Sequence, residues 1–93
     1  MLFLVQCIDK PDAGPIRPNT RPAHLRYLEG FTKEIVIAGP TLGPDHQTPT
    51  GSVFIVSMHD EQAVERFCRD DPYAKAGLFA RTTIQPFRQV IPA

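Results

Sequence analysis

Apolar and polar residues follow two different periods along this chain, and the alternation between them predicts its secondary structure. Runs rich in β-branched and large apolar residues predict strands over residues 1–8, 35–40, 52–58 and 78–87. Proline, glycine and polar residues predict loops over residues 9–19 and 41–51. Gly39-Pro40 closes the second strand, and Pro86 marks the last strand as an edge strand.

A helical period connects the first and second strands. Thr20 can cap a helix that runs to about Glu34, with Pro22 in the first turn, where proline loses no hydrogen bond. At about 100° per residue, one face of this helix is apolar and contains Leu25, Leu28, Phe31 and Ile35. His24 falls near the middle of the same arc, so we expect its side chain to point inward.

A second helix is predicted after the third strand. Asp60 and Glu61 suit the positive end of a helix, and the apolar residues that follow keep helical spacing. Asp71 and Pro72 end this helix, because a residue before proline is pushed out of the α region. A short helical turn is expected over residues 73–77 before the last strand.

The predicted order is β-α-β-β-α-β, which is typical of the ferredoxin-like α+β fold in a single domain spanning residues 1–93. The first and third strands are the most continuously apolar and should lie in the centre of the sheet. Two helices can cover only one face of a four-stranded sheet, which leaves an apolar face that soluble monomers avoid. We therefore predict a homodimer that packs sheet against sheet, or sheet edge against a partner's tail.

Composition and charge exclude several classes of partner. The formal net charge is zero, with 10 basic and 10 acidic residues and no basic stripe, so no nucleic-acid partner is expected. No apolar run approaches the ~20 residues that cross a bilayer, and the apolar N-terminus lacks the basic region and cleavage site of a signal peptide. Cys7 and Cys68 lie in apolar segments without a pairing motif, which favours free buried thiols and a cytoplasmic location over a disulfide.

His24 is the leading candidate for chemistry. In a first helical turn, the positive helix end would keep its imidazole neutral and available as a base. Asp71 is the candidate partner that would fix the tautomer, and Tyr73 brings a phenol to the same segment. The alternatives are a core histidine bonded to backbone carbonyls and an aspartate that is only a solvated helix-end residue.

Other polar residues have weaker signals. Arg21, beside the predicted helix start, could hold a carboxylate or a phenolate together with free backbone N–H groups, although a solvated arginine is an equal alternative. At Gly39 and Pro40 the backbone could approach a ligand closely, or the pair could simply end the strand. Ser52 has no adjacent base, which argues against a serine nucleophile. The three histidines have no metal-ligand spacing, so no metal site is expected.

Three short motifs occur in a recognisable order. Residues 21–25 (Arg-Pro-Ala-His-Leu), 38–40 (Ala-Gly-Pro) and 70–73 (Asp-Asp-Pro-Tyr) together resemble the YciI-like (YCII-related) family over essentially the whole chain. This resemblance implies a dimeric α+β barrel without a cofactor. It also implies a histidine and aspartate site at His24 and Asp71, with acid–base chemistry on small, often aromatic or lactone-like compounds, including dehydrochlorination of a chlorinated hydroquinone. The proline-rich loop over residues 41–51 departs from the family and leaves the substrate open.

Two hypotheses about function follow. The first is a cofactor-independent isomerase or lyase of the dehydrochlorinase type, in which His24 and Asp71 are catalytic. Arg21, Gly39, Pro40 and Tyr73 would then bind a small aromatic or lactone-like substrate. The second is a non-catalytic small-molecule binder or dimeric interaction protein, in which His24 supplies only a hydrogen bond.

Overall fold

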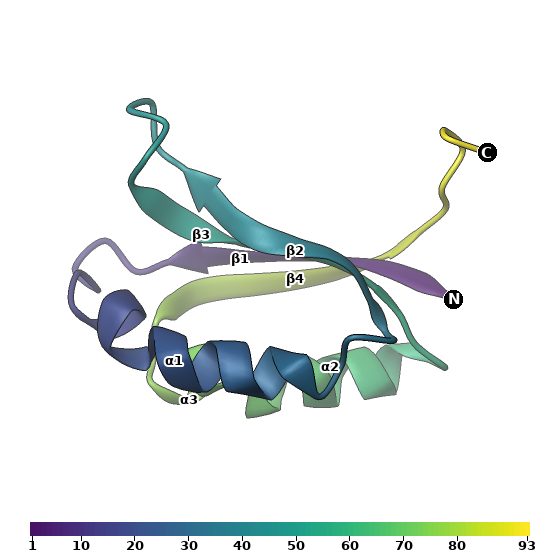
Figure 1. Ribbon diagram of the computed structural model, residues 1–93, viewed down its shortest axis with the longest axis horizontal. Helices are drawn as coiled ribbons and strands as arrows, with labels where there is room; N and C mark the ends of the chain where they lie inside the picture. Colours follow the sequence, from purple (N-terminus) through teal and green to yellow (C-terminus); the bar gives the residue numbers. More distant parts are fainter.

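The computed structural model describes residues 1–93 and places all helices on one face of a single sheet (Figure 1). The elements are β1 (Leu2–Asp9), α1 (Ile16–Glu29), β2 (Ile35–Leu42), β3 (Pro49–Ser57), α2 (Glu61–Asp70), α3 (Pro72–Lys75) and β4 (Phe79–Phe87). The predicted β-α-β-β-α-β order and the extra helical turn before the last strand are confirmed. No helix of the chain combines the length and apolar character needed to span a membrane.

The sheet is antiparallel throughout and has the strand order β2-β3-β1-β4. The central position of β1 and β3 and the edge position of β4 are therefore confirmed. Val5 pairs with Phe54 and Phe3 with Val56, and all four side chains face the helices and are buried. With helix residues they form the main core, which consists of Phe3, Val5, Cys7, Phe54, Val56, Met58, Val64 and Phe67.

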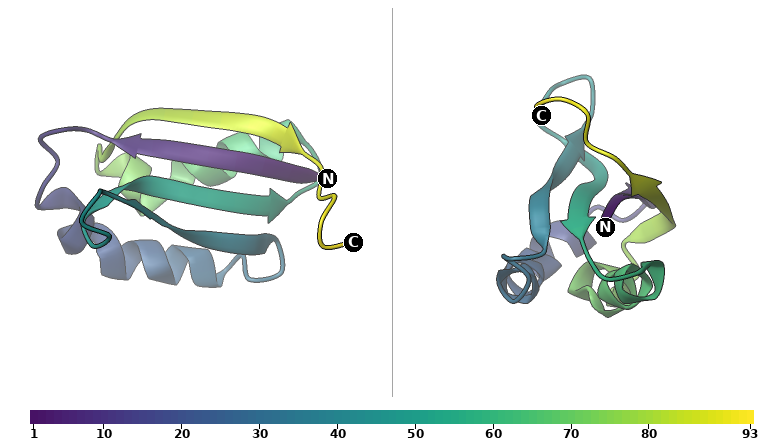
Figure 2. Two further views of the ribbon diagram at one scale, coloured as in Figure 1. Left: turned by 90° about the horizontal axis from the view of Figure 1, so that it is seen from above. Right: turned by 90° about the vertical axis from the view of Figure 1, so that its right-hand side faces the viewer.

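The other face of the sheet is not covered by any element of the chain (Figure 2). Leu4 pairs with Ile55, and Ile55 with Ile37, so these three side chains share this open face. Ile37 is 59% exposed and Ile8 on the same face is 46% exposed. The predicted uncovered apolar face is therefore present.

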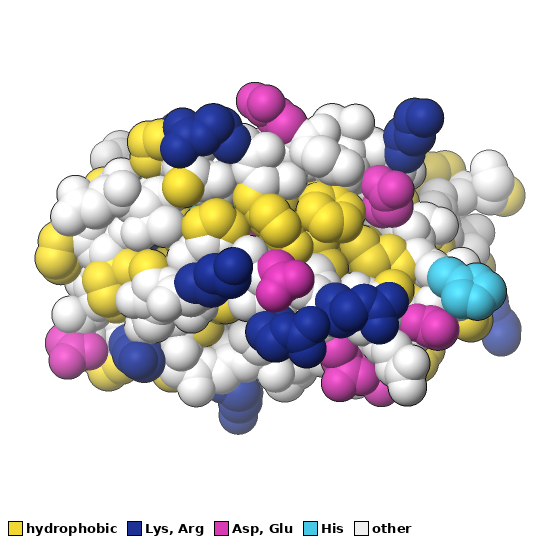
Figure 3. Space-filling view, turned by 90° about the horizontal axis from the view of Figure 1, so that it is seen from below, with side chains coloured by type: hydrophobic (Ala, Val, Ile, Leu, Met, Phe, Trp, Pro, Cys, Tyr) yellow, Lys and Arg dark blue, Asp and Glu magenta, His cyan; other side chains and the backbone are white.

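The outer face of the helix layer has a different character. Charged side chains cover the helices, and apolar side chains line a furrow that runs between them (Figure 3). Tyr27 of α1 and Phe31, in the turn after α1, meet Phe67 of α2 there, with ring centroids 4.9–5.7 Å apart. The Tyr27 hydroxyl donates to the carbonyl of Phe67 at 2.8 Å, which ties the two helices together.

The prediction for the ends of α1 was wrong. The helix begins at Ile16, four residues before Thr20, and ends at Glu29, where Gly30 forms the C-cap. Pro15 and Pro18 suggested a loop, yet both lie where a helix has backbone N–H groups without an intrahelical acceptor, so neither costs a hydrogen bond. Pro22 consequently lies inside the helix rather than in its first turn.

The loop between β2 and β3 is also shorter than predicted. β2 continues through Gly39-Pro40 to Leu42, and β3 already begins at Pro49. β2 is an edge strand, where a proline without an N–H group is tolerated. In the turn, Asp45 accepts hydrogen bonds from the backbone N–H groups of Gln47 and Thr48, which stabilises the hairpin tip.

Candidate active site

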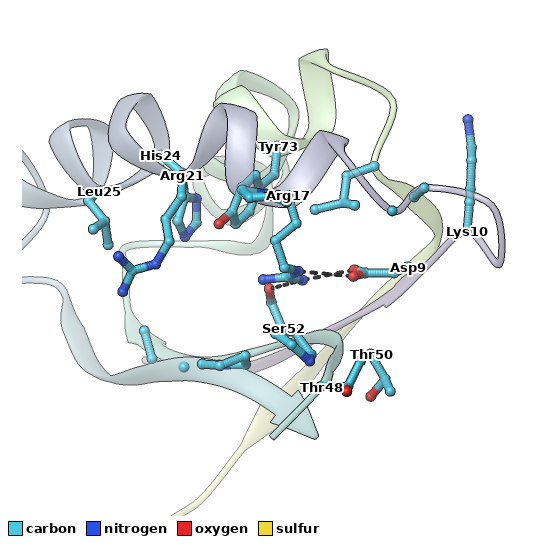
Figure 4. A pocket seen from close by; sticks show the side chains of 18 of the residues that line it. Asp9, Lys10, Arg17, Arg21, His24, Leu25, Thr48, Thr50, Ser52 and Tyr73 are labelled. Atoms are coloured by element: carbon cyan, nitrogen blue, oxygen red, sulfur yellow. Dashed lines mark hydrogen bonds and ion pairs between the residues drawn. The ribbon is translucent and has the colours of Figure 1, made fainter. Parts of the chain in front are cut away.

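A pocket of about 800 Å³ lies between α1 and the sheet, at the end where β1 leads into α1 and β2 turns into β3 (Figure 4). This volume is within the range typical of small-molecule sites, about 300–1,000 Å³. Five residues singled out in the sequence line the pocket, namely Arg21, His24, Gly39, Pro40 and Tyr73. The sixth, Asp71, lies behind His24 and is only 2% exposed.

His24 and Asp71 form a hydrogen-bonded pair. Nδ1 of the imidazole is 2.8 Å from Oδ1 of the carboxylate, and both residues are buried. An ionised carboxylate only accepts hydrogen bonds, so Nδ1 is the donor, and in a neutral imidazole Nε2 then carries the lone pair. Nε2 has no hydrogen-bond partner in the chain. Because no fully buried side-chain nitrogen or oxygen lacks a partner, Nε2 is not fully buried, and solvent reaches it from the pocket that His24 lines. The contact expected between the two residues is present, and it presents a basic nitrogen to the pocket.

Local structure explains how Asp71 reaches this position. It follows the last residue of α2 in extended conformation, and the same carboxylate oxygen accepts the backbone N–H of Tyr73 at 2.9 Å. Asp71 therefore caps the start of α3, with Pro72 in the first helical position, where proline is favoured. An acidic residue is unfavourable at the end of α2, but it is favourable at the start of α3.

His24 is not in the first turn of its helix. Because α1 begins at Ile16, His24 lies in the third turn, away from the positive helix end. The prediction that the positive end of the helix acts on the His24 imidazole was therefore wrong. Its surroundings are aromatic instead. The ring stacks on Tyr73 with centroids 3.8 Å apart, and Phe54 lies edge-on with centroids 6.3 Å apart.

Arg17, Asp9 and Ser52 form a second polar group that sequence reasoning missed (Figure 4). The Arg17 guanidinium donates two hydrogen bonds to the Asp9 carboxylate, at 2.9 and 2.8 Å, and a third to Ser52 Oγ at 3.1 Å. Burial alone lowers the pKa of Arg17, but the hydrogen bonds and charge of Asp9 raise it above its usual value. The pocket therefore contains a fixed cation beside a hydroxyl.

Arg17 was missed because it lies in the segment that its prolines marked as a loop. Once the helix is known to begin at Ile16, the spacing of Arg17, Arg21 and His24 places all three on one face. This spacing is the feature of the sequence that could have identified Arg17 as a site residue. Ser52 was considered only as a nucleophile, and the structure places it as a hydrogen-bond partner of Arg17 instead.

Tyr73 contacts both the His24–Asp71 pair and the group formed by Arg17, Asp9 and Ser52. One face of its ring stacks on His24, and Cζ of Arg17 is 4.8 Å from the ring centroid. Burial raises the pKa of the Tyr73 phenol above its usual value, although the charges of Arg17 and Arg21 oppose the shift. The hydroxyl consequently stays protonated at neutral pH and can donate a hydrogen bond.

Arg21 is not beside the start of a helix, as had been predicted, so no free backbone N–H groups of a helix end lie next to it. Its side chain is exposed, has no hydrogen bond or ion pair within the chain, and extends into the pocket (Figure 4). Gly39 and Pro40 lie within β2 and form part of the opposite wall. Their contact with a ligand stays a prediction. No group of three or more His, Cys, Asp or Glu side chains is placed to hold a metal ion.

Comparison with known proteins identifies a family that matches the chain. The sequence profile of the YCII-related domain matches residues 1–88. The chain is 32% identical to protein YciI of Escherichia coli O6:H1, over 97% of this chain and 99% of that protein. An uncharacterised protein of Haemophilus influenzae is 30% identical, again over 97% of this chain and 99% of that protein.

Solved structures extend the comparison. A 5-chloro-2-hydroxyhydroquinone dehydrochlorinase from Burkholderia phenoliruptrix, in complex with 2,5-dihydroxybenzoquinone, is 36% identical with a TM-score of 0.89, covering 97% of this chain and 96% of that one. SnoaB, a cofactor-independent oxygenase from Streptomyces nogalater, is 10% identical with a TM-score of 0.57, covering 99% and 96%. The second likeness concerns the fold alone, which is that of the dimeric α+β barrel proteins.

Proposed function

The chain belongs to the YCII-related domain family, and from the site it carries we propose that it is a cofactor-independent acid–base enzyme. Its substrate in this proposal is a small hydroxylated aromatic or lactone-like metabolite, and the reaction is an isomerisation or the elimination of a leaving group. The observation that carries the proposal is the buried His24–Asp71 pair, whose free nitrogen faces a pocket of about 800 Å³.

His24 is the proposed general base and acid. Nε2 takes a proton from a ring hydroxyl or from a carbon next to a carbonyl, and the imidazole becomes a cation. Asp71 stabilises that cation and holds the ring in its tautomer, so its role is positioning. In an isomerisation, the electron pair left behind forms a new C–H bond at another ring carbon with the proton that Nε2 returns. In an elimination, the electron pair expels an anion such as chloride, and Nε2 passes its proton to solvent. In the elimination one proton and one anion leave, so charge balances.

Arg17 and Ser52 are the proposed site for the developing negative charge. A proton leaving a hydroxyl or an adjacent carbon places charge on an oxygen, and a fixed cation stabilises it without moving during the reaction. Asp9 is bonded to two nitrogens of Arg17 and keeps the guanidinium in place. Nearly dry surroundings strengthen this effect, since the side chains of both Arg17 and Asp9 are 12% exposed.

The aromatic walls favour a flat substrate. Tyr73 and Phe54 line the pocket beside His24 and give this part of its wall an aromatic, apolar surface. The dehydrochlorinase that is 36% identical to this chain was solved with a hydroxylated quinone. A ring of that kind, with an oxygen beside Arg17 and Ser52 and a carbon beside His24, matches the proposed chemistry.

We also propose that the chain acts as a homodimer joined through the open sheet face. Ile37, Ile55 and Leu4 form an apolar surface there that no part of the chain covers. Sedimentation at micromolar concentration should give a dimer, and Ile37→Lys should shift it toward monomer. A wild-type monomer under these conditions would contradict this part of the proposal.

The test of the catalytic proposal is His24→Gln, with His59→Gln as the matched control because His59 is exposed and outside the pocket. Release of chloride from 5-chloro-2-hydroxyhydroquinone gives the first assay, followed by other ring-hydroxylated and lactone compounds. We expect His24→Gln to lower turnover about 10²–10⁴-fold, with the circular dichroism spectrum and the affinity for 2,5-dihydroxybenzoquinone retained. Unchanged turnover in His24→Gln, or a wild type inactive on the whole panel, would refute the proposal.

A further inference from the structure

The charges that line the pocket do not cancel, although those of the whole chain do. The chain has 10 basic and 10 acidic residues, whereas the charged lining residues are Asp9, Lys10, Arg17 and Arg21. Asp9 is paired with Arg17. Lys10 is directed away from the side chains at the centre of the pocket (Figure 4). Arg21 is therefore a cation in the pocket that has no counterion in the chain.

Arg21 is placed to meet a ligand. It follows Arg17 by one helical turn on α1, and its guanidinium extends from the helix toward the sheet across the pocket (Figure 4). It is near enough to Tyr73 to oppose the rise in the pKa of that phenol. In contrast, Arg26 on the same helix is also exposed but does not line the pocket.

We infer that the substrate carries a carboxylate in addition to its hydroxylated ring, and that Arg21 binds this carboxylate. The inference rests on the proposed function, in which Arg17 and Ser52 hold a ring oxygen and leave Arg21 for a second anionic group. A guanidinium can bind a carboxylate through two parallel hydrogen bonds, which selects it over a neutral group of the same shape.

The spacing of the two arginines indicates the size of this ligand. They are four positions apart, which corresponds to a rise of about 6 Å between their backbone positions along α1. That is roughly the width of one aromatic ring. A monocyclic compound with its hydroxyl and its carboxylate on opposite sides can therefore reach Arg17 and Arg21 together, with its ring beside His24.

The experiment compares three ligands that lack a leaving group, so binding is measured without turnover. They are 3,4-dihydroxybenzoate, its uncharged amide 3,4-dihydroxybenzamide, and catechol. Affinities are measured by calorimetry for the wild type, Arg21→Gln and Arg26→Gln. The last variant makes the same change in net charge outside the pocket.

We expect the wild type and Arg26→Gln to bind the benzoate about tenfold more tightly than the benzamide, as for a bidentate ion pair in a partly desolvated site. In Arg21→Gln this preference should vanish while the affinity for catechol is unchanged. No preference in the wild type, a preference that survives Arg21→Gln, or an equal loss in Arg26→Gln would overturn the inference.

The result is independent of the catalytic proposal. His24→Gln should retain the preference for the benzoate, because His24 does not contact the carboxylate in this arrangement. Loss of turnover in His24→Gln without any preference for the benzoate would remove only the carboxylate inference. A preference for the benzoate with full turnover in His24→Gln would remove only the catalytic role of His24.

Discussion

Replacing Asp71 with asparagine separates the two roles that its carboxylate has in the structure. One oxygen accepts from His24 Nδ1 at 2.8 Å and from the backbone N–H of Tyr73 at 2.9 Å. It therefore orients the imidazole and caps α3. An asparagine carbonyl can accept both bonds in the same geometry, but it has no charge. The variant removes the charge opposite His24 and keeps the cap.

The size of the effect follows from these two bonds. A hydrogen bond with a charged partner contributes about 1.5–3 kcal/mol and a neutral one about 1 kcal/mol. A loss of about 1–2 kcal/mol when the imidazole is charged in the transition state corresponds to turnover about 5–30-fold lower. The free energy of unfolding should fall by only about 1 kcal/mol. Asp71→Ala leaves two buried N–H groups without acceptors and should cost about 2–6 kcal/mol.

The assay needs stability and turnover from the same samples. Urea unfolding gives the free energy of unfolding for the wild type and both variants, and chloride release gives turnover per folded molecule. The ¹⁵N shifts of the His24 ring report its tautomer, which should be protonated at Nδ1 in the wild type. Asp71 would be purely structural if Asp71→Asn unfolded as readily as Asp71→Ala while its folded fraction kept full turnover.

Three further predictions concern the pocket and the core. Asp9→Asn removes the charged partner of Arg17, so it should lower the free energy of unfolding by about 1–3 kcal/mol and weaken binding of 2,5-dihydroxybenzoquinone. The control Asp12→Asn, at an exposed position, should change neither the stability nor the binding. Gly51→Ala should destabilise the chain by about 3 kcal/mol or more in urea unfolding, since its Cβ would lie 2.2 Å from the Cys7 carbonyl oxygen, whereas Gly39→Ala, with nothing within 4 Å, should change stability by less than about 1 kcal/mol. Burial raises the pKa of the Cys7 thiol from 9.0 to about 11, so the folded state keeps a proton that the unfolded chain loses above pH 9. The free energy of unfolding should therefore fall between pH 9 and 11 and be flat just below pH 9, and a fall of equal size in Cys7→Ala would contradict this cause.

The sequence was sufficient for those parts of the fold that depend on local pattern. The continuously apolar character of the first and third strands predicted their central position, and Pro86 predicted an edge strand, because these features depend only on residues close in sequence. The predicted start of α1 was wrong because proline is common both in loops and at the start of a helix, so Pro15 and Pro18 could not distinguish the two. Only the rest of the fold decides which applies.

The site depended more strongly on tertiary contacts. The sequence offered Asp71 only as a candidate partner for His24, 47 positions away, and the family resemblance is what favoured this pair over an ordinary helix-end aspartate. Arg17 lies 8 positions from Asp9 and 35 from Ser52, so three elements must pack before the group exists. An arginine, an aspartate and a serine are ordinary surface residues until that packing is known.

Tyr73 gives the two halves of the proposed site a fixed geometry. Its backbone N–H is bonded to the same Asp71 oxygen that orients His24, and its ring stacks on the His24 imidazole. The same ring lies under the guanidinium of Arg17, which Asp9 holds through two hydrogen bonds. The proposed base and the proposed oxyanion site are therefore separated by one aromatic ring rather than by a flexible loop. Because catalysis of this kind depends on groups that do not reorganise during the reaction, this shared support is the feature that most favours an enzyme over a passive binder.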